Sequence, residues 1–361
     1  MKYCGMALLF LCLFVTPCSA QDSDLWQTVG GEELARAGEQ YGIGLELSDQ
    51  VNINDQIESL ARRAGEHLPG VVRSAVGSSL MLLVTVVLCS MAQSIQSEGA
   101  PSGGINVPLM AGSLAITAVA ANDMQSMMGL GRSTMDAIQG FSQILLPVMA
   151  TCTAAAGHAG AAAARQVATA MFCNIVITLI DRVLVKLVYA YLAACTAYVA
   201  IGNPGLKRIA DMIKWVVTKA LTILLVAFVA YLTMVGAVAG SADAVALKAT
   251  KTVIANLIPV VGRVISDASE TILVGAGALK NTVGVIGLLA VLAICLMPFL
   301  RLLAHYLAYK LSAALSATVA DSRLWEMIAG IGTAFGLILG MTGSCAVVML
   351  VSMLSGLTGG G

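Results

Sequence analysis

Long apolar stretches, separated by short polar or turn-rich segments, run through most of this 361-residue chain. An α-helix needs about 20 apolar residues to cross the hydrocarbon of a bilayer, so such stretches predict membrane spans. Strong stretches lie at residues 76–92, 220–239 and 283–300. Further stretches lie at residues 107–121, 144–164, 167–180, 187–201, 302–320 and 328–354. We therefore expect an all-α polytopic integral membrane helical bundle with seven to nine spans.

The first twenty residues have the layout of a secretory signal peptide. Lys2 precedes an apolar core at residues 6–15, and the small residues Ser19 and Ala20 form a cleavage site. The alternative, a first transmembrane helix, is disfavoured because this core is too short to span about 30 Å of hydrocarbon. We expect residues 1–20 to be a cleaved signal peptide, which would leave Gln21 outside the cytoplasm.

Charge divides the remaining chain in two. Residues 21–70 carry ten acids and three bases, whereas residues 71–361 carry ten acids and sixteen bases. Apolar residues at helical spacing, from Ile57 to Leu68, predict an amphipathic helix that lies on the outer leaflet, on a partner or in solvent. We expect a short acidic extracytoplasmic segment at 21–70, followed by a polytopic membrane domain at 71–361.

Two charged junctions leave the number of spans open. Asp181, Arg182 and Lys186 separate two short apolar stretches, and this favours a turn. If the helix instead continues there, Asp181 becomes a pairing or pathway residue, because a charge inside a span needs a partner. Residues 206–219 predict an interfacial helix with Trp215 in the headgroup zone.

Basic residues suggest an orientation. With a cleaved signal, and with residues 302–320 lying at the membrane surface, eight spans place one set of bases in the cytoplasm. This agrees with the positive-inside rule, although the loop at residues 240–282 then lies outside with four bases of its own. The cytoplasmic set is Lys207, Arg208, Lys214, Lys219, Arg301, Lys310 and Arg323.

Residues 240–282 are too polar for an ordinary span and too apolar for a soluble loop. Pro259 and Gly262 interrupt the helical pattern, so we expect a re-entrant or interfacial hairpin of two short amphipathic helices. Its polar side chains line an aqueous passage, contact another subunit, or lie among lipid headgroups. These candidates are Lys248, Lys251, Asn256, Pro259, Gly262, Arg263, Asp267, Glu270 and Lys280.

Gly332, Gly336 and Gly340 repeat every four residues in the last apolar stretch. Small residues at this spacing let two helix backbones approach closely in lipid. Packing within the bundle is the favoured interpretation, and assembly of a homo-oligomer is the alternative.

Composition excludes several classes of function. The chain is 58% hydrophobic and 11% charged, against roughly 25% charged residues in soluble domains. No stretch has the basic density of a nucleic-acid-binding protein. Nucleotide-binding and hydrolase signatures are missing, and we expect no catalytic, cofactor or metal site. The six cysteines beyond the signal lie singly in apolar stretches, as small packing residues do: Cys89, Cys152, Cys173, Cys195, Cys295 and Cys345.

The stretch from residue 258 to residue 320 resembles the stage III sporulation protein AE family of endospore-forming bacteria. The resemblance is carried by Ile-Pro-Val-Val-Gly at 258–262, Ser-Asp-Ala-Ser-Glu-Thr at 266–271 and Lys-Asn-Thr-Val-Gly-Val-Ile-Gly at 280–287. It continues through Pro298 and the Tyr-Lys-Leu of 309–311. The order of signal peptide, acidic segment and membrane body also fits.

This resemblance implies a non-enzymatic membrane subunit, scaffold or conduit, of a complex in the mother-cell membrane that surrounds the forespore. Other subunits would supply an ATPase and ring-forming proteins, and a forespore partner would join across the intermembrane space. Two other functions stay open: a secondary transporter, which would need paired broken helices, and a polytopic component of a conjugative secretion machine. Neighbouring genes would distinguish the three.

Overall fold

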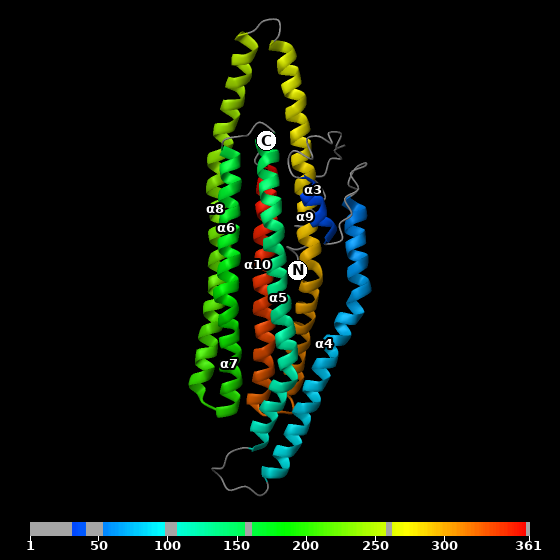
Figure 1. Ribbon diagram of the computed structural model, residues 1–361. Helices are drawn as coiled ribbons and strands as arrows, with labels where there is room; N and C mark the ends of the chain where they lie inside the picture. The colour runs from blue at the N-terminus through cyan, green and yellow to red at the C-terminus, as the bar shows by residue number, and fades with distance from the viewer. Residues whose placement is uncertain (1–30, 41–52, 98–106, 156–160, 258–261, 359–361) are drawn as a thin grey trace.

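The computed structural model describes residues 31–40, 53–97, 107–155, 161–257 and 262–358. Within these residues the chain is helical and contains no strand. The long helices form one elongated bundle and run in alternating directions (Figure 1). They are α3 (Gly31–Gln40), α4 (Ile53–Ser97), α5 (Val107–Ala155), α6 (Ala161–Leu179), η1 (Ile180–Leu184), α7 (Val185–Ile201), α8 (Pro204–Leu257), α9 (Gly262–Ser316) and α10 (Ser322–Thr358).

The all-helical architecture follows from the solvent that such an apolar chain needs. Hydrocarbon offers no hydrogen bonds, so each backbone group must be satisfied within its own helix. Among the described residues, five helices are long and apolar enough to cross a membrane, which is fewer than the seven to nine spans expected. These are the segments Ile57–Ile95, Leu109–Ala154, Pro204–Tyr231, Thr282–Ser316 and Ser322–Met353.

Helix α5 accounts for part of this difference. Residues 107–121 and 144–164 were expected as separate spans, but a single helix runs from Val107 to Ala155. The polar stretch between them stays helical because its charged side chains reach neighbouring helices. Asp123 accepts a hydrogen bond from α9, and Arg132 forms an ion pair with η1. The second expected span was also placed too far along the chain, because α5 ends at Ala155.

The expected turn at Asp181 is wrong. Helices α6 and α7 are joined by η1, a π-helical turn in which the Val185 N–H donates to the Ile180 carbonyl. A π turn inserts one extra residue into a helix without ending it. Residues 161–201 therefore form one continuous helical rod, and the apolar stretches on both sides of the charges share it.

Two segments expected at the membrane surface are also parts of longer helices. Residues 206–219 form the beginning of α8, which continues through the apolar stretch that follows. Residues 302–316 complete α9, with Pro298 accommodated inside the helix. Leu302 and Tyr309 are fully buried, so one face of this part of α9 packs in the bundle, while Leu307, Leu311 and Leu315 on the other face are exposed.

Helix α7 ends at a glycine that the turn requires. Gly202 has a φ of 75°, and its N–H donates to the Tyr198 carbonyl at 2.7 Å. A side chain at this left-handed position would be strained. A Cβ there would also lie 2.7 Å from the Arg323 guanidinium of α10. The tight turn at residues 202–203 thus sets α8 antiparallel to α7.

Helices α5, α9 and α10 form the centre of the bundle, and α4 and α8 lie at its periphery. In the most apolar 18-residue stretch of each helix, the share that is buried inside the bundle is 56% in α9 and in α10 and 50% in α5, but only 22% in α4 and 17% in α8. Leu88 and Ile95 of α4, and Ile223 and Val226 of α8, are more than 60% exposed. Apolar faces this extensive need lipid or a protein partner to cover them.

The bundle is longer than a bilayer is thick. At about 1.5 Å per residue, the 49 residues of α5 measure roughly 70 Å, against about 30 Å of hydrocarbon. The seven bases assigned to the cytoplasm all lie in the first part of α8, the last part of α9 or the start of α10. These parts lie at the same end of the bundle (Figure 1). The ends of α8 and α9 that flank residues 258–261 lie at the opposite end and extend beyond the other helices.

The continuity of the α6–α7 rod can be tested by a distance measurement. Spin labels at Met171 and Ile201, both exposed, are separated by thirty residues, or about 45 Å along a continuous helix. Double electron–electron resonance on the purified protein should give a distance near this value. A hairpin at Asp181 would bring the labels far closer, so a short distance would contradict the rod.

Candidate functional site

The hairpin candidates occupy the far ends of α8 and α9. Residues 240–257 complete α8 and residues 262–282 begin α9, so the two halves of the hairpin are the ends of long helices and not separate short ones. Pro259 lies outside the described residues, and for the other eight candidates only the course of the helix is described. Their role as a polar lining or subunit contact stays a prediction from their spacing.

Gly332, Gly336 and Gly340 lie on sides of α10 that face α9 or α8. A Cβ on Gly332 would lie 3.1 Å from Tyr309 Cβ and 3.5 Å from the Lys310 backbone nitrogen of α9. A Cβ on Gly336 would lie 2.8 Å from the Tyr306 ring. Gly340 differs, because it is exposed and its nearest neighbour is Leu221 of α8 at 3.8 Å. The first two glycines therefore sit where α9 comes closest, and the third does not.

Beside this close contact between α9 and α10, a buried carboxylate joins α5 to α9. The Tyr309 hydroxyl donates to Asp123 Oδ2 at 2.8 Å, and both side chains are buried. The Tyr309 ring also meets Phe335 of α10 edge to face, with centroids 4.9 Å apart. Tyr309 thus connects three helices, and Asp123 has a strong donor where an unpaired carboxylate would be costly. Sequence reasoning missed Asp123 because its partner lies 186 residues away.

Helix α4 is attached to α9 by hydroxyl contacts. The Ser79 hydroxyl donates to the Ala308 carbonyl at 3.1 Å, and it also hydrogen-bonds the Ser312 hydroxyl.

His305, one turn before Tyr309, is buried, and its Nδ1 lies 3.0 Å from the Arg301 carbonyl. The His305 ring thus makes its hydrogen bond within its own helix, α9.

A second polar group lies between α5 and the α6–α7 rod. Arg132 Nε lies 3.4 Å from Asp181 Oδ1, and the Gln139 amide donates to Asn174 Oδ1 at 2.8 Å. Arg132 also lies over the Tyr189 ring, 6.0 Å from its centroid. Asp181 is thus a pairing residue, as expected for a continuous helix. About 40% of both ionised side chains is exposed, so water screens the pair and limits what it contributes to stability.

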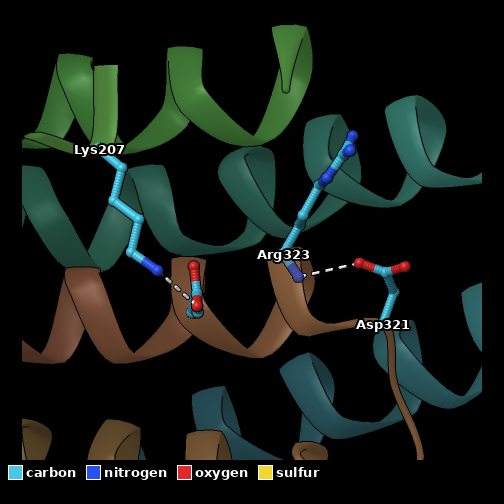
Figure 2. Close-up of polar contacts among 4 residues, drawn as sticks. Lys207, Asp321 and Arg323 are labelled. Carbon is cyan, nitrogen blue, oxygen red and sulfur yellow. Dashed lines mark hydrogen bonds and ion pairs between the residues drawn. The ribbon is translucent and has the colours of Figure 1, made fainter. Parts of the chain in front are cut away.

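Polar contacts also organise the basic end of the bundle. The Lys207 ammonium of α8 lies 2.7 Å from Glu326 Oε1 of α10. Figure 2 draws Lys207 together with Asp321 and Arg323 at this end of the bundle. Asp321 caps the start of α10, because its Oδ1 accepts a hydrogen bond from the Arg323 backbone N–H at 2.9 Å. The Lys207–Glu326 pair brings the α7–α8 and α9–α10 turns together at one end, whereas the Asp321 cap is local to α10.

The cysteines and histidines form no reactive cluster in the described part of the chain. Five of the six cysteines beyond the expected signal are buried, Cys195 is partly buried, and none of the six is joined in a disulfide bond. No group of three or more His, Cys, Asp or Glu side chains there is arranged to hold a metal ion. The contacts above thus hold helices together, and none of them forms an arrangement known for catalysis.

The comparisons with known proteins agree on one family. A sequence model of the stage III sporulation protein AE family matches residues 48–358. The stage III sporulation protein AE of Bacillus subtilis (strain 168) is 25% identical over 236 residues, which is 65% of this chain and 59% of that protein. The aligned part is thus less than two thirds of the relative's length. No solved structure matches the chain.

The close approach of α10 to α9 at Gly332 and Gly336 gives a prediction about packing. Gly332→Leu and Gly336→Leu should each force α10 away from α9 and destabilise the protein by about 1–3 kcal/mol, the usual cost of overpacking. Gly340→Leu is the matched control and should be tolerated, because Gly340 is exposed and a Cβ there would make only an ordinary contact with Leu221 at 3.8 Å. Thermal unfolding of the three variants in detergent measures the difference. Equal stability of all three would show that the spacing has no packing role.

The Asp123 contact generates a second prediction. Tyr309→Phe removes the donor to a buried carboxylate and should cost about 1–3 kcal/mol of stability. Tyr306→Phe is the control, because the described contacts give the Tyr306 hydroxyl no hydrogen bond. The same unfolding measurement should separate the two variants, and a neutral Tyr309→Phe would mean that Asp123 has another donor.

Proposed function

This chain belongs to the stage III sporulation protein AE family, and we propose that it is a non-enzymatic subunit of a channel complex between mother cell and forespore. It would act as a scaffold or conduit in the mother-cell membrane around the forespore. Its partners would be an ATPase and ring-forming proteins of the same complex, and a forespore protein across the intermembrane space. The observation that carries the proposal is the family match, which extends from α4 to the end of α10.

The architecture supports a membrane subunit. Among the residues that the structure describes, five helices are apolar and long enough to span a bilayer, and α4 and α8 present broad apolar faces to their surroundings. The remaining length of the helices must lie outside the hydrocarbon, where it is available to protein partners. A scaffold needs such a rigid rod that is anchored in lipid and extends beyond it.

The two ends of the bundle suggest how it is oriented. The basic end carries the seven bases named above, and the positive-inside rule places such an end in the cytoplasm. Helices α8 and α9 extend beyond the other helices at the opposite end (Figure 1), and we infer that this end projects into the intermembrane space. Arg263, Asp267 and Glu270 follow one another at helical spacing near the start of α9. We assign this projecting charged stripe to contact with another subunit or to the wall of an aqueous passage.

The membership in a complex is tested by purification from sporulating cells. A tagged, full-length chain should bring down the other membrane subunits of the complex from detergent extracts of sporulating cells. An unrelated tagged polytopic protein from the same membrane is the control. Recovery of the chain without any sporulation partner would reject the subunit role.

Reversing one charge tests the proposed contact. Asp267→Lys should block forespore development while the protein still accumulates, because a partner surface or polar passage that is matched to an acid does not accept a base. Glu58→Lys, at an exposed acid of α4 outside the stripe, is the control and should sporulate normally. If Asp267→Lys also sporulates normally, the hairpin only anchors the chain among anionic headgroups, which would accept the added base.

A further inference from the structure

Helix α5 exposes a polar face along the middle of its length. Between residues 122 and 143, every exposed position of α5 is polar or glycine, and none is a large apolar residue. These positions recur at helical spacing and share one side of the helix. At about 1.5 Å per residue, they extend over about 30 Å. The polar face of α5 consists of Asn122, Gln125, Ser126, Gly129, Ser133, Asp136, Gly140 and Gln143.

The start of the polar face lies at a depth where α4 is apolar on its outer side. The Tyr309 hydroxyl of α9 donates to Asp123 of α5, and the Ser79 hydroxyl of α4 donates to the carbonyl one residue before Tyr309. Asp123 and Ser79 are therefore at the same height in the bundle. Val76 and Leu80, on either side of Ser79, are both about half exposed. At this height α4 thus presents apolar side chains to its surroundings, and α5 presents polar ones.

The end of the polar face lies at a depth where α8 is apolar on its outer side. The Gln139 amide of α5 donates to Asn174 of the α6–α7 rod. Phe172, two residues before Asn174, packs against Phe228 of α8 with ring centroids 5.5 Å apart. Val229, next to Phe228, is more than half exposed. Apolar side chains flank the bundle at both heights, so the polar face lies at the depth of the hydrocarbon.

The polar face needs a cover that this chain does not supply. In the described part of the chain, no hydrogen bond or ion pair joins the side chains of Asn122, Gln125, Asp136 or Gln143 to another group. Hydrocarbon offers such groups no hydrogen bonds, and a carboxylate exposed to it is costly. Water or another polypeptide must therefore cover this side of α5.

The glycines of the polar face favour another polypeptide. A Cβ on Gly129 or Gly140 would meet nothing within 4 Å. A Cβ on Gly131, on the inner side of α5, would lie 2.5 Å from Ile338 of α10. Gly131 thus serves the packing of this chain, whereas Gly129 and Gly140 leave open space beside the backbone. Small residues placed in this way let a second helix approach closely in lipid, and contact with water does not require them.

We propose that the polar face of α5 binds the same face of a second copy of this chain inside the membrane. Amide and hydroxyl groups both donate and accept hydrogen bonds, so a face of Asn, Gln and Ser is complementary to itself. Copies inserted in the same direction are related by an axis along the membrane normal, which places equal residues at equal depths. Arg132, four residues before Asp136 and 41% exposed, offers a counter-charge to Asp136 of the second copy.

Oxidative cross-linking of the full-length protein in native membranes tests this contact. Ser133→Cys, at the centre of the polar face, should give a disulfide-linked dimer when copper phenanthroline is added. Val226→Cys, on the exposed apolar side of α8, is the matched control and should stay monomeric. The unchanged protein should also stay monomeric, because its described cysteines are buried or partly buried.

A second substitution tests the close approach of the two helices. In the Ser133→Cys protein, Gly140→Leu should lower the cross-linked fraction roughly tenfold, because it fills the space that the second helix would occupy. Gly77→Leu is the control, since Gly77 of α4 is also a glycine with nothing within 4 Å, and it should leave cross-linking unchanged. Both variants should accumulate in the membrane, because neither added side chain meets the packing of a single chain.

Three results would overturn the proposal. Equal cross-linking of Ser133→Cys and Val226→Cys would mean that the dimer arises from random collision. Absence of a dimer would mean a different cover. Labelling of Ser133→Cys by a membrane-impermeant thiol reagent would then identify that cover as water, and protection would identify it as a different subunit. An equal loss of cross-linking in Gly77→Leu and Gly140→Leu would also reject the polar face as the site of contact.

Discussion

The contact between α9 and α10 supports the rest of the bundle. Within hydrocarbon there is no hydrophobic drive to bring two apolar helices together, so their association depends on close packing and on polar contacts. Gly332 and Gly336 let the α10 backbone approach the Tyr306 and Tyr309 side chains of α9. Tyr309 and Phe335 are fully buried at this contact. The other helices pack around the pair, and they would lose their common surface if it separated.

Polar contacts attach the surrounding helices to α9 and α10 at defined positions along their length. Asp123 binds α5 to α9, Ser79 binds α4 to α9, and Lys207 binds α8 to α10. The buried Asp123 and Ser79 contacts fix the register of α5 and α4 against α9, because a polar group moved away from its partner in an apolar setting loses several kcal/mol. The Lys207–Glu326 pair is partly exposed, so water screens it and it contributes less. Apolar packing alone would resist sliding of one helix along another far less.

These constraints produce a rod with two unlike ends. One end gathers the bases and two tight turns, and the other carries the projecting ends of α8 and α9. The role proposed above, that of a membrane subunit in a complex, would need an anchor in lipid and a surface for partners beyond it. The bundle supplies both with the same helices, because these are about twice as long as the hydrocarbon is thick.

The sequence by itself determined the class of the protein. Its apolar stretches predicted an all-helical membrane bundle, and its motifs at residues 258–287 indicated the family. The glycines at 332, 336 and 340 predicted a packing face; a Cβ on either of the first two would meet α9, and one on Gly340 would not. These features are local, since hydropathy, motif and spacing are all written within a few turns of one helix.

Only the tertiary structure decided where the helices end. A charged junction such as Asp181 to Lys186 resembles a turn when it is viewed alone, and residues 122–136 resemble a break between two spans. Both continue as helix because their charged side chains find partners far along the chain. Arg132 forms an ion pair with Asp181, and the Tyr309 hydroxyl donates a hydrogen bond to Asp123. The cost of a charge inside a helical bundle depends on what the neighbouring helix places beside it, and no local pattern records that.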